Sequence, residues 1–149
     1  MAELSIGVVR IRALKHNINV EELDKVEIAR LEVNLTGQFT IKINLETNSV
    51  SISAGIVLKC RRGNNYIDLQ NLSIETIFAV PDLNDQVDDN GQLRLPLFRL
   101  LVNTSYDHLR AIQAINSAAT PLESYIIPLL AVKDDEYLKY LGAMSIDPV

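Results

Sequence analysis

The sequence lacks most of the features that mark secreted, membrane or disulfide-stabilised proteins. Its 149 residues include no tryptophan, one cysteine and only 5% aromatic residues. A single cysteine, Cys60, cannot form a disulfide within the chain. No apolar run approaches the roughly 18 residues that cross a membrane. The amino terminus has no basic region followed by an apolar one, so we expect no signal peptide and a cytoplasmic protein.

The chain also lacks the excess of positive charge that is typical of nucleic-acid-binding proteins. It has 14 Lys and Arg against 19 Asp and Glu, for a net charge of −5. This balance argues against generic binding to phosphate backbones. Hydrophobic residues make up 48% of the chain, which is enough for a core. The length and composition predict one domain that spans residues 1–149.

No motif for catalysis or for cofactor binding is present. The six glycines are scattered and form no phosphate-binding loop. His16 and His108 fall in different predicted elements, and neither has a Cys or His at metal-ligand spacing. Cys60 is best explained as a small buried hydrophobic residue, with a reactive thiol beside Arg61 and Arg62 as the alternative. The acidic segment 81–91 is best explained as a solvated loop, with partner binding as the alternative. We therefore expect no enzyme, metal or cofactor, although a site assembled only by folding stays an alternative.

A strict alternation of apolar and polar residues runs from Leu31 to Leu45. A period of two predicts a β-strand with one buried face and one solvated face. A strand of this length would extend about 50 Å at ~3.3 Å per residue. Small domains seldom need such strands for their own core, so we expect the sheet to serve a partner or a bound chain. Gly37 in mid-strand predicts a bend or bulge.

Two further long strands follow. The alternation resumes from Val50 to Arg61 after a turn at 46–49, which predicts a hairpin with the preceding strand. Another strand is predicted over Tyr66–Val80. Its apolar residues change parity near Asn71, which predicts a bulge.

The first strand is predicted over Ser5–Leu14. Its parity changes between Val8 and Val9, which again favours a bulge. The polar segment His16–Lys25 is expected to be a loop or a single helical turn. The first half of the chain is therefore predicted to be a four-stranded antiparallel meander.

The second half has helical periodicity. Pro96 suits a helix start, and a long helix is predicted to Ala118. Thr120–Glu123 fits a capping box that opens one turn at most. Tyr125–Val132 is predicted to be extended because Pro128 excludes a regular helix. A short helix is predicted over Glu136–Leu141. The fold class is α+β: a meander sheet with a long and a short carboxy-terminal helix on one face.

This arrangement resembles the SecB family of export chaperones, from about Ile6 to Leu141. Two local similarities support it. Residues 72–80 (LSIETIFAV) resemble the apolar end of the family's fourth strand, which contains an Ile-Phe pair. The segment Ala119-Thr120-Pro121, with Pro128 beyond it, resembles the family's turn and proline-containing loop between its two helices. Here Ala119 replaces the family's usual Gly, and no aromatic residue precedes Pro121.

The resemblance implies an ATP-independent holdase that binds unfolded or export-bound polypeptides. It implies a dimer that joins two sheets, and a tetramer that contacts through the long helices. Each residue assigned on this basis has ordinary core packing as its alternative. The residues expected to line a peptide groove are Phe39, Ile41, Ile43, Phe78, Tyr125, Ile126 and Ile127. The residues expected at an oligomer interface are Leu101, Tyr106, His108, Leu109 and Ile112.

The resemblance weakens at the sites where the family docks on the SecA motor. Family members use acidic residues on the outer face of the sheet together with the terminal tail. The matching segment, Leu69-Gln70-Asn71-Leu72, has no Glu, and the tail Asp147-Pro148-Val149 is short. The alternative to an export chaperone is a SecB-like domain for one specific partner, for example in toxin–antitoxin control.

Overall fold

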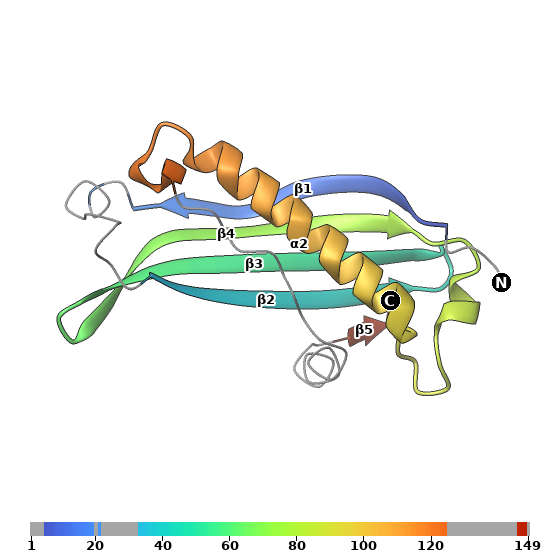
Figure 1. Cartoon of the computed structure of the whole chain (residues 1–149). Helices are drawn as coiled ribbons and strands as arrows, with labels where there is room; N and C mark the ends of the chain where they lie inside the picture. The colour runs from blue at the N-terminus through green and yellow to red at the C-terminus, as the bar shows by residue number, and fades with distance from the viewer. Residues whose placement is uncertain (1–4, 20, 22–32, 125–145, 149) are drawn as a thin grey trace.

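The computed structural model describes residues 5–19, 21, 33–124 and 146–148, and has an α+β fold (Figure 1). Four antiparallel strands of the sheet are crossed on one face by a long helix, as the sequence predicts. The predictions for Tyr125–Val132 and Glu136–Leu141 lie outside the described residues. The elements are β1 (Gly7–Ile18), β2 (Val33–Asn44), β3 (Ser49–Arg62), β4 (Asn65–Ala79), η2 (Leu83–Gln86), α2 (Leu95–Ser117), η3 (Pro121–Ser124) and β5 (Ile146–Pro148).

Strands β2, β3 and β4 form two consecutive hairpins, which confirms the predicted long strands and their turns. At the first turn, the Asn44 side-chain oxygen accepts hydrogen bonds from the backbone N–H groups of Glu46 and Thr47. Asn48 adopts a positive φ of 49° there, and Gly63 has a φ of 64° in the second turn. These residue types tolerate the left-handed conformation that tight turns require.

The order of the strands differs from the predicted four-strand meander. The order is β1-β4-β3-β2-β5, so β1 pairs with β4 and not with β2. Residues 19–32 separate β1 from β2, which is too long a connection for a tight hairpin. Three hairpin-connected strands with a fourth beside the far one form a Greek key. Sequence periodicity does not determine which edge a distant strand joins.

Bulges occur where the parity of apolar residues changes. Val8 pairs with Phe78 and Arg10 with Ile77, so Val9 is an extra residue in β1; Leu14 is a second one. In β4, the pairing with β3 skips Leu69, two residues from the predicted site. The pairing of β2 with β3 is unbroken, so the bulge predicted at Gly37 is wrong.

Strand β1 extends four residues beyond the predicted end at Leu14, and the loop predicted from His16 begins later. Asn17 pairs with Asn71 and Ile18 with Gln70. The ladder continues to Asn19, whose N–H donates to the Leu69 carbonyl at 2.9 Å. Pairing with β4 therefore outweighs the weak strand propensity of this polar segment.

The short strand β5 was not predicted from the sequence. Ile146–Pro148 pairs in parallel with residues 41–43 of β2. Three residues carry too little periodicity to be recognised in isolation. Among the described strands, β5 lies at one end of the sheet and β1 at the other (Figure 1).

The core lies between α2 and one face of the sheet. Pro96 stands in the first turn of α2, and the helix ends at Ser117, close to both predicted limits. A larger cluster packs Ile41, Ile52 and Phe78 against the first half of α2, and a smaller one packs residues of β3 and β4 against Tyr106 and Leu109. Beyond the helix, the Thr120 hydroxyl accepts from the Leu122 N–H at 3.2 Å, which confirms the predicted single turn.

Candidate functional site

The free edge of β1 is the most unusual surface of the described chain. One side of β1 pairs with β4, and no described strand pairs with the other side. All residues from Gly7 to Asn17 are exposed. Four large apolar side chains nevertheless lie here: Val8, Val9, Ile11 and Leu14, the edge strip, with exposed fractions of 40–64%. A long apolar edge without covering is a surface that folded proteins normally protect.

The bulges explain how the edge strip arises. Val9 and Leu14 are the extra residues, so they fall outside the ladder. Val8 and Ile11 are in register with Phe78 and Thr76, which point to the helix-covered face. The side chains of Val8 and Ile11 therefore face the helix side of the sheet, where α2 does not cover them. The sequence signal for this was the parity change at Val8–Val9, which predicted a bulge but not the exposure.

The side of α2 that carries His108 contacts β4, which is the strand next to β1. Thr76 Oγ1 and His108 Nδ1 share a hydrogen bond of 3.3 Å, and Thr76 is the cross-strand neighbour of Ile11. Ile112 and Ile115 follow His108 at i+4 and i+7, so they lie on the same side of the helix. Ile115 is 72% exposed. An apolar surface thus extends from the edge strip towards this side of α2.

His108 lies at the margin of that surface. Burial lowers the pKa of its imidazole, and the nearby Asp107 carboxylate opposes this shift by raising it. Desolvation is the larger cause, so the neutral ring is favoured in the folded chain. A neutral imidazole next to Thr76 suits an apolar contact surface better than a cation does.

The predicted groove residues that are described lie mainly within the core. Ile41, Ile43 and Phe78 are buried beneath the first half of α2. Phe39 is half-buried between the two clusters, with its ring centroid 6.4 Å from that of Tyr106. The remaining predicted groove residues, Tyr125, Ile126 and Ile127, lie outside the described residues. The peptide groove stays a prediction for this set.

The predicted oligomer-interface residues mostly face the sheet of their own chain. Leu101, Tyr106 and Leu109 are buried there, whereas His108 and Ile112 are half-buried. Their interface role also stays a prediction. The large apolar side chains that α2 exposes to solvent are Leu100 and Ile115.

A buried polar network holds the end of α2 to the sheet. Gln113 Nε2 donates to Gln70 Oε1 at 3.2 Å and to Ser117 Oγ at 2.9 Å. Gln70 Nε2 lies 3.3 Å from Ser117 Oγ and 3.4 Å from His16 Nε2. Sequence reasoning missed this network. Its signal was that Gln70 shares the parity of Leu72 and Ile74, and that Gln113 follows Leu109 at i+4.

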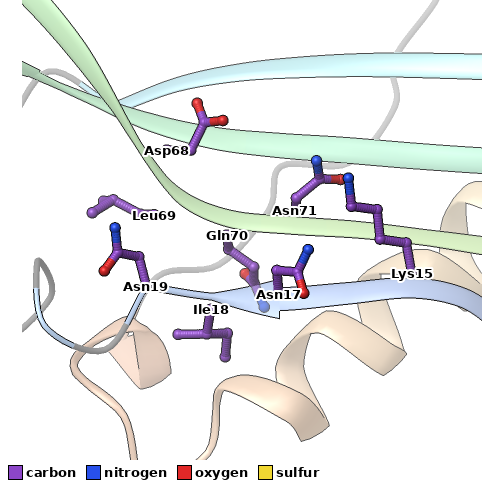
Figure 2. A pocket seen from close by; sticks show the side chains of 8 residues that line it. All are labelled: Lys15, Asn17, Ile18, Asn19, Asp68, Leu69, Gln70 and Asn71. Atoms are coloured by element: carbon purple, nitrogen blue, oxygen red, sulfur yellow. The ribbon is translucent and has the colours of Figure 1, made fainter.

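A polar pocket of about 280 Å³ lies where β1 and β4 meet near the Leu69 bulge (Figure 2). It contains one cation, one carboxylate and several amides, a set that can form hydrogen bonds but has no nucleophile beside a base. No group of three His, Cys, Asp or Glu in the described ranges could hold a metal ion. The lining residues are Lys15, Asn17, Ile18, Asn19, Asp68, Leu69, Gln70 and Asn71.

Comparisons with known proteins give a structural match and no sequence match. No family model matches the chain, and no curated protein does. The SecB-like chaperone Rv1957 of Mycobacterium tuberculosis, solved with a ChAD peptide from the HigA1 antitoxin, superposes with a TM-score of 0.55 and 11% identity. The match covers 86% of this chain and 92% of that one. A protein of unknown function from Streptococcus agalactiae gives a TM-score of 0.38 and 8% identity, over 89% of this chain and 99% of that one.

The match to the mycobacterial protein shows that this chain has a SecB-like fold. It agrees with the resemblance found in the sequence, which rested on element order and two short segments. The described part of the chain has no helix long and apolar enough to span a membrane.

Proposed function

We propose that this protein is a SecB-type holdase that binds unfolded or extended polypeptide without ATP. A fold alone does not determine function, so the proposal rests on the surface. The single observation that supports it best is the exposed apolar surface formed by the edge strip and the adjacent side of α2. An exposed apolar surface of this kind suits a partner that brings apolar side chains.

Extended polypeptide matches this surface in chemistry. Apolar contacts contribute about 25 cal/mol per Å² of buried surface and are non-directional, so many sequences can bind. The predicted groove residues Tyr125, Ile126 and Ile127 are apolar or aromatic and suit the same kind of contact. The mycobacterial SecB-like chaperone, which holds an antitoxin peptide, offers a precedent for peptide binding on this fold.

The same proposal includes self-assembly. Two copies that pair along β1 would join their sheets through the backbone groups of this edge, while Val8 and Ile11 still face the helix side of the joined sheet. A dimer of such dimers would give the tetramer that the family resemblance implies. Leu100 on α2 is an exposed apolar residue available for the second contact. The proposal places this assembly in the cytoplasm.

An aggregation assay tests the holdase activity. A chemically unfolded, aggregation-prone protein is diluted into buffer with and without stoichiometric amounts of this protein, in the absence of nucleotide. The expected result is that light scattering from aggregates is suppressed. Aggregation at the rate of the protein-free control would refute the holdase.

A second candidate is a SecB-like domain that serves one specific partner. The observation that favours it is the antitoxin peptide in the mycobacterial structure. Under this alternative, a pull-down yields one stable complex of defined composition, and unrelated unfolded proteins do not compete for it. Competition by several unrelated unfolded proteins would favour the general holdase.

A further inference from the structure

The sheet face opposite α2, here called the outer face, is rich in basic residues. In β1, Arg10, Arg12 and Lys15 are in register with Ile77, Glu75 and Ser73 of β4. Those β4 residues alternate with the buried Leu72, Ile74, Thr76 and Phe78 and so point away from the helix. The cations of β1 therefore share the outer face.

Cations also occur on the other strands of the outer face. Lys42 is in register with Ser51, Lys59 with Asp68 and Arg61 with Tyr66. Lys42 and Lys59 each lie between two buried residues of their strands, and Arg61 continues the alternation of β3. These three side chains therefore also point away from α2. Between these cations, the outer face carries Ser51, Ser53, Gly55 and Ser73 together with the larger Val57 and Ile77.

Among the described residues, few carboxylates lie next to the cations Arg10, Arg12, Lys15, Lys42 and Lys59. Glu75 accepts from Arg12 at 2.9 Å, and Asp68 lies 3.8 Å from Lys59. Asp147 of β5 is in register with Lys42. Within the described ranges, neither Arg10 nor Lys15 forms an ion pair with a carboxylate. They lie on either side of the Arg12–Glu75 pair along the exposed β1 strand.

A basic face is notable because the whole chain carries a net charge of −5. Much of the opposite charge is placed elsewhere, for example on Asp82, Asp85, Asp88 and Asp89 of the segment that follows β4. The family resemblance implies an acidic outer face for SecA docking, and the outer face of this chain has the opposite sign. Its partner should therefore carry negative charge.

From this placement we infer that the outer face docks an acidic polypeptide segment of another protein. Arg10 and Lys15 are the cations that bind its carboxylates, and the hydroxyls of Ser51, Ser53 and Ser73 supply hydrogen bonds to the segment. Lys15 also lines the polar pocket with Asn17 and Asn71 (Figure 2), whose amides can bond to a peptide backbone.

A polypeptide fits this face better than a nucleic acid does. A regular array of phosphates would meet Glu75 and Asp68 among the cations, and the acidic chain as a whole repels a polyanion. A peptide can place its carboxylates over Arg10 and Lys15 and uncharged residues over Glu75. The inference is independent of the holdase proposal, because it uses the opposite face of the sheet.

Fluorescence anisotropy tests the inference with a labelled twelve-residue peptide of alternating Glu and Ser. The wild-type protein should bind it, and binding should weaken as salt is raised from 50 to 500 mM because exposed charges are screened. The variant Arg10→Ser/Lys15→Ser should bind roughly three- to ten-fold more weakly, as expected for the loss of two exposed charge contacts. Both side chains are exposed, so the fold should be retained.

The matched control is Ala111→Glu/Ala114→Glu, which changes the net charge equally at exposed positions of α2. This control should bind the peptide as the wild type does. Equal weakening in both variants would overturn the proposal, because the effect would then follow net charge alone. Stronger binding of a single-stranded DNA of the same charge would overturn it too. Light scattering of each variant, at the concentration used, separates lost docking from altered assembly.

Discussion

At the scale of single residues, His108 connects the core to the candidate surface. Its ring contacts Thr76 across the helix–sheet boundary, and burial lowers its pKa below the ordinary value of 6.5. The family resemblance placed His108 among the residues expected at an oligomer interface. The structure places it half-buried, at the margin between both environments. We therefore expect its protonation to be coupled to folding.

The free energy of unfolding should depend on pH through His108. Between the lowered pKa and 6.5, the folded chain holds fewer protons than the unfolded chain, so stability falls as pH decreases through that interval. His108→Asn keeps a hydrogen-bonding group near Thr76 but cannot titrate. Urea unfolding of both proteins between pH 7.5 and 5 should show a shallower dependence for the variant. Parallel pH profiles would show that His108 is not coupled to folding.

At the scale of elements, two features have testable consequences. The polar network holds the end of α2 to the sheet, and the edge of β1 is available for assembly. The network joins β1, β4 and α2 through His16, Gln70, Gln113 and Ser117. Buried amides with complete partners specify one helix position, whereas a broken network is costly. The network and the β1 edge each give a prediction.

The Gln70–Gln113 contact should behave as a coupled pair. Gln113→Ala leaves the buried Gln70 Oε1 without its donor, so we expect a loss of about 1–3 kcal/mol of unfolding free energy. Gln70→Leu/Gln113→Leu removes both polar groups and should cost less than the sum of the two single Leu changes. Denaturant titration of the wild type, the two single Leu variants and the double Leu variant gives the coupling energy. Strict additivity would show that the two amides do not act together.

The β1 edge should control assembly. Val9 and Leu14 are exposed bulge residues, so Val9→Lys/Leu14→Lys should leave the monomer folded and introduce charge where a second β1 would pair. Light scattering should give a dimer or tetramer for the wild type and a smaller species for the variant. Leu45→Lys, at an exposed turn residue away from this edge, should assemble normally. A monomeric wild type would contradict self-pairing.

At the scale of the whole molecule, the sequence predicts the strands and the long helix, but only the structure shows which strands are neighbours in the sheet. Alternation over Leu31–Leu45 and helical spacing after Pro96 are local patterns, so β2 and α2 follow from them directly. The pairing of β1 with β4 depends on contacts distant in sequence and was not predictable from periodicity. The outer face was missed for the same reason: Arg10 and Lys59 share a face only after the register is known.

The candidate site was predicted less completely than the fold. The alternation of apolar residues places Ile41 and Phe78 on the apolar face of the sheet, but it does not show whether they belong to the core or to a groove. In the structure, α2 buries both side chains. The exposed apolar residues Val8 and Ile11 belong to the same face of the sheet. They stay uncovered because α2 crosses the sheet diagonally (Figure 1), and a crossing angle is set by packing rather than by local sequence.

The central claim is that the apolar surface between β1 and α2 binds unfolded polypeptide. The most direct test is an anisotropy titration with a labelled, permanently unfolded protein. The wild type should bind, and so should Leu45→Lys/Tyr66→Lys, which changes exposed apolar residues elsewhere. Ile11→Lys/Ile115→Lys should bind about ten-fold more weakly, since two lost apolar contacts amount to roughly 1.4 kcal/mol. Equal affinity of the two double variants, or no binding by the wild type, would contradict the account.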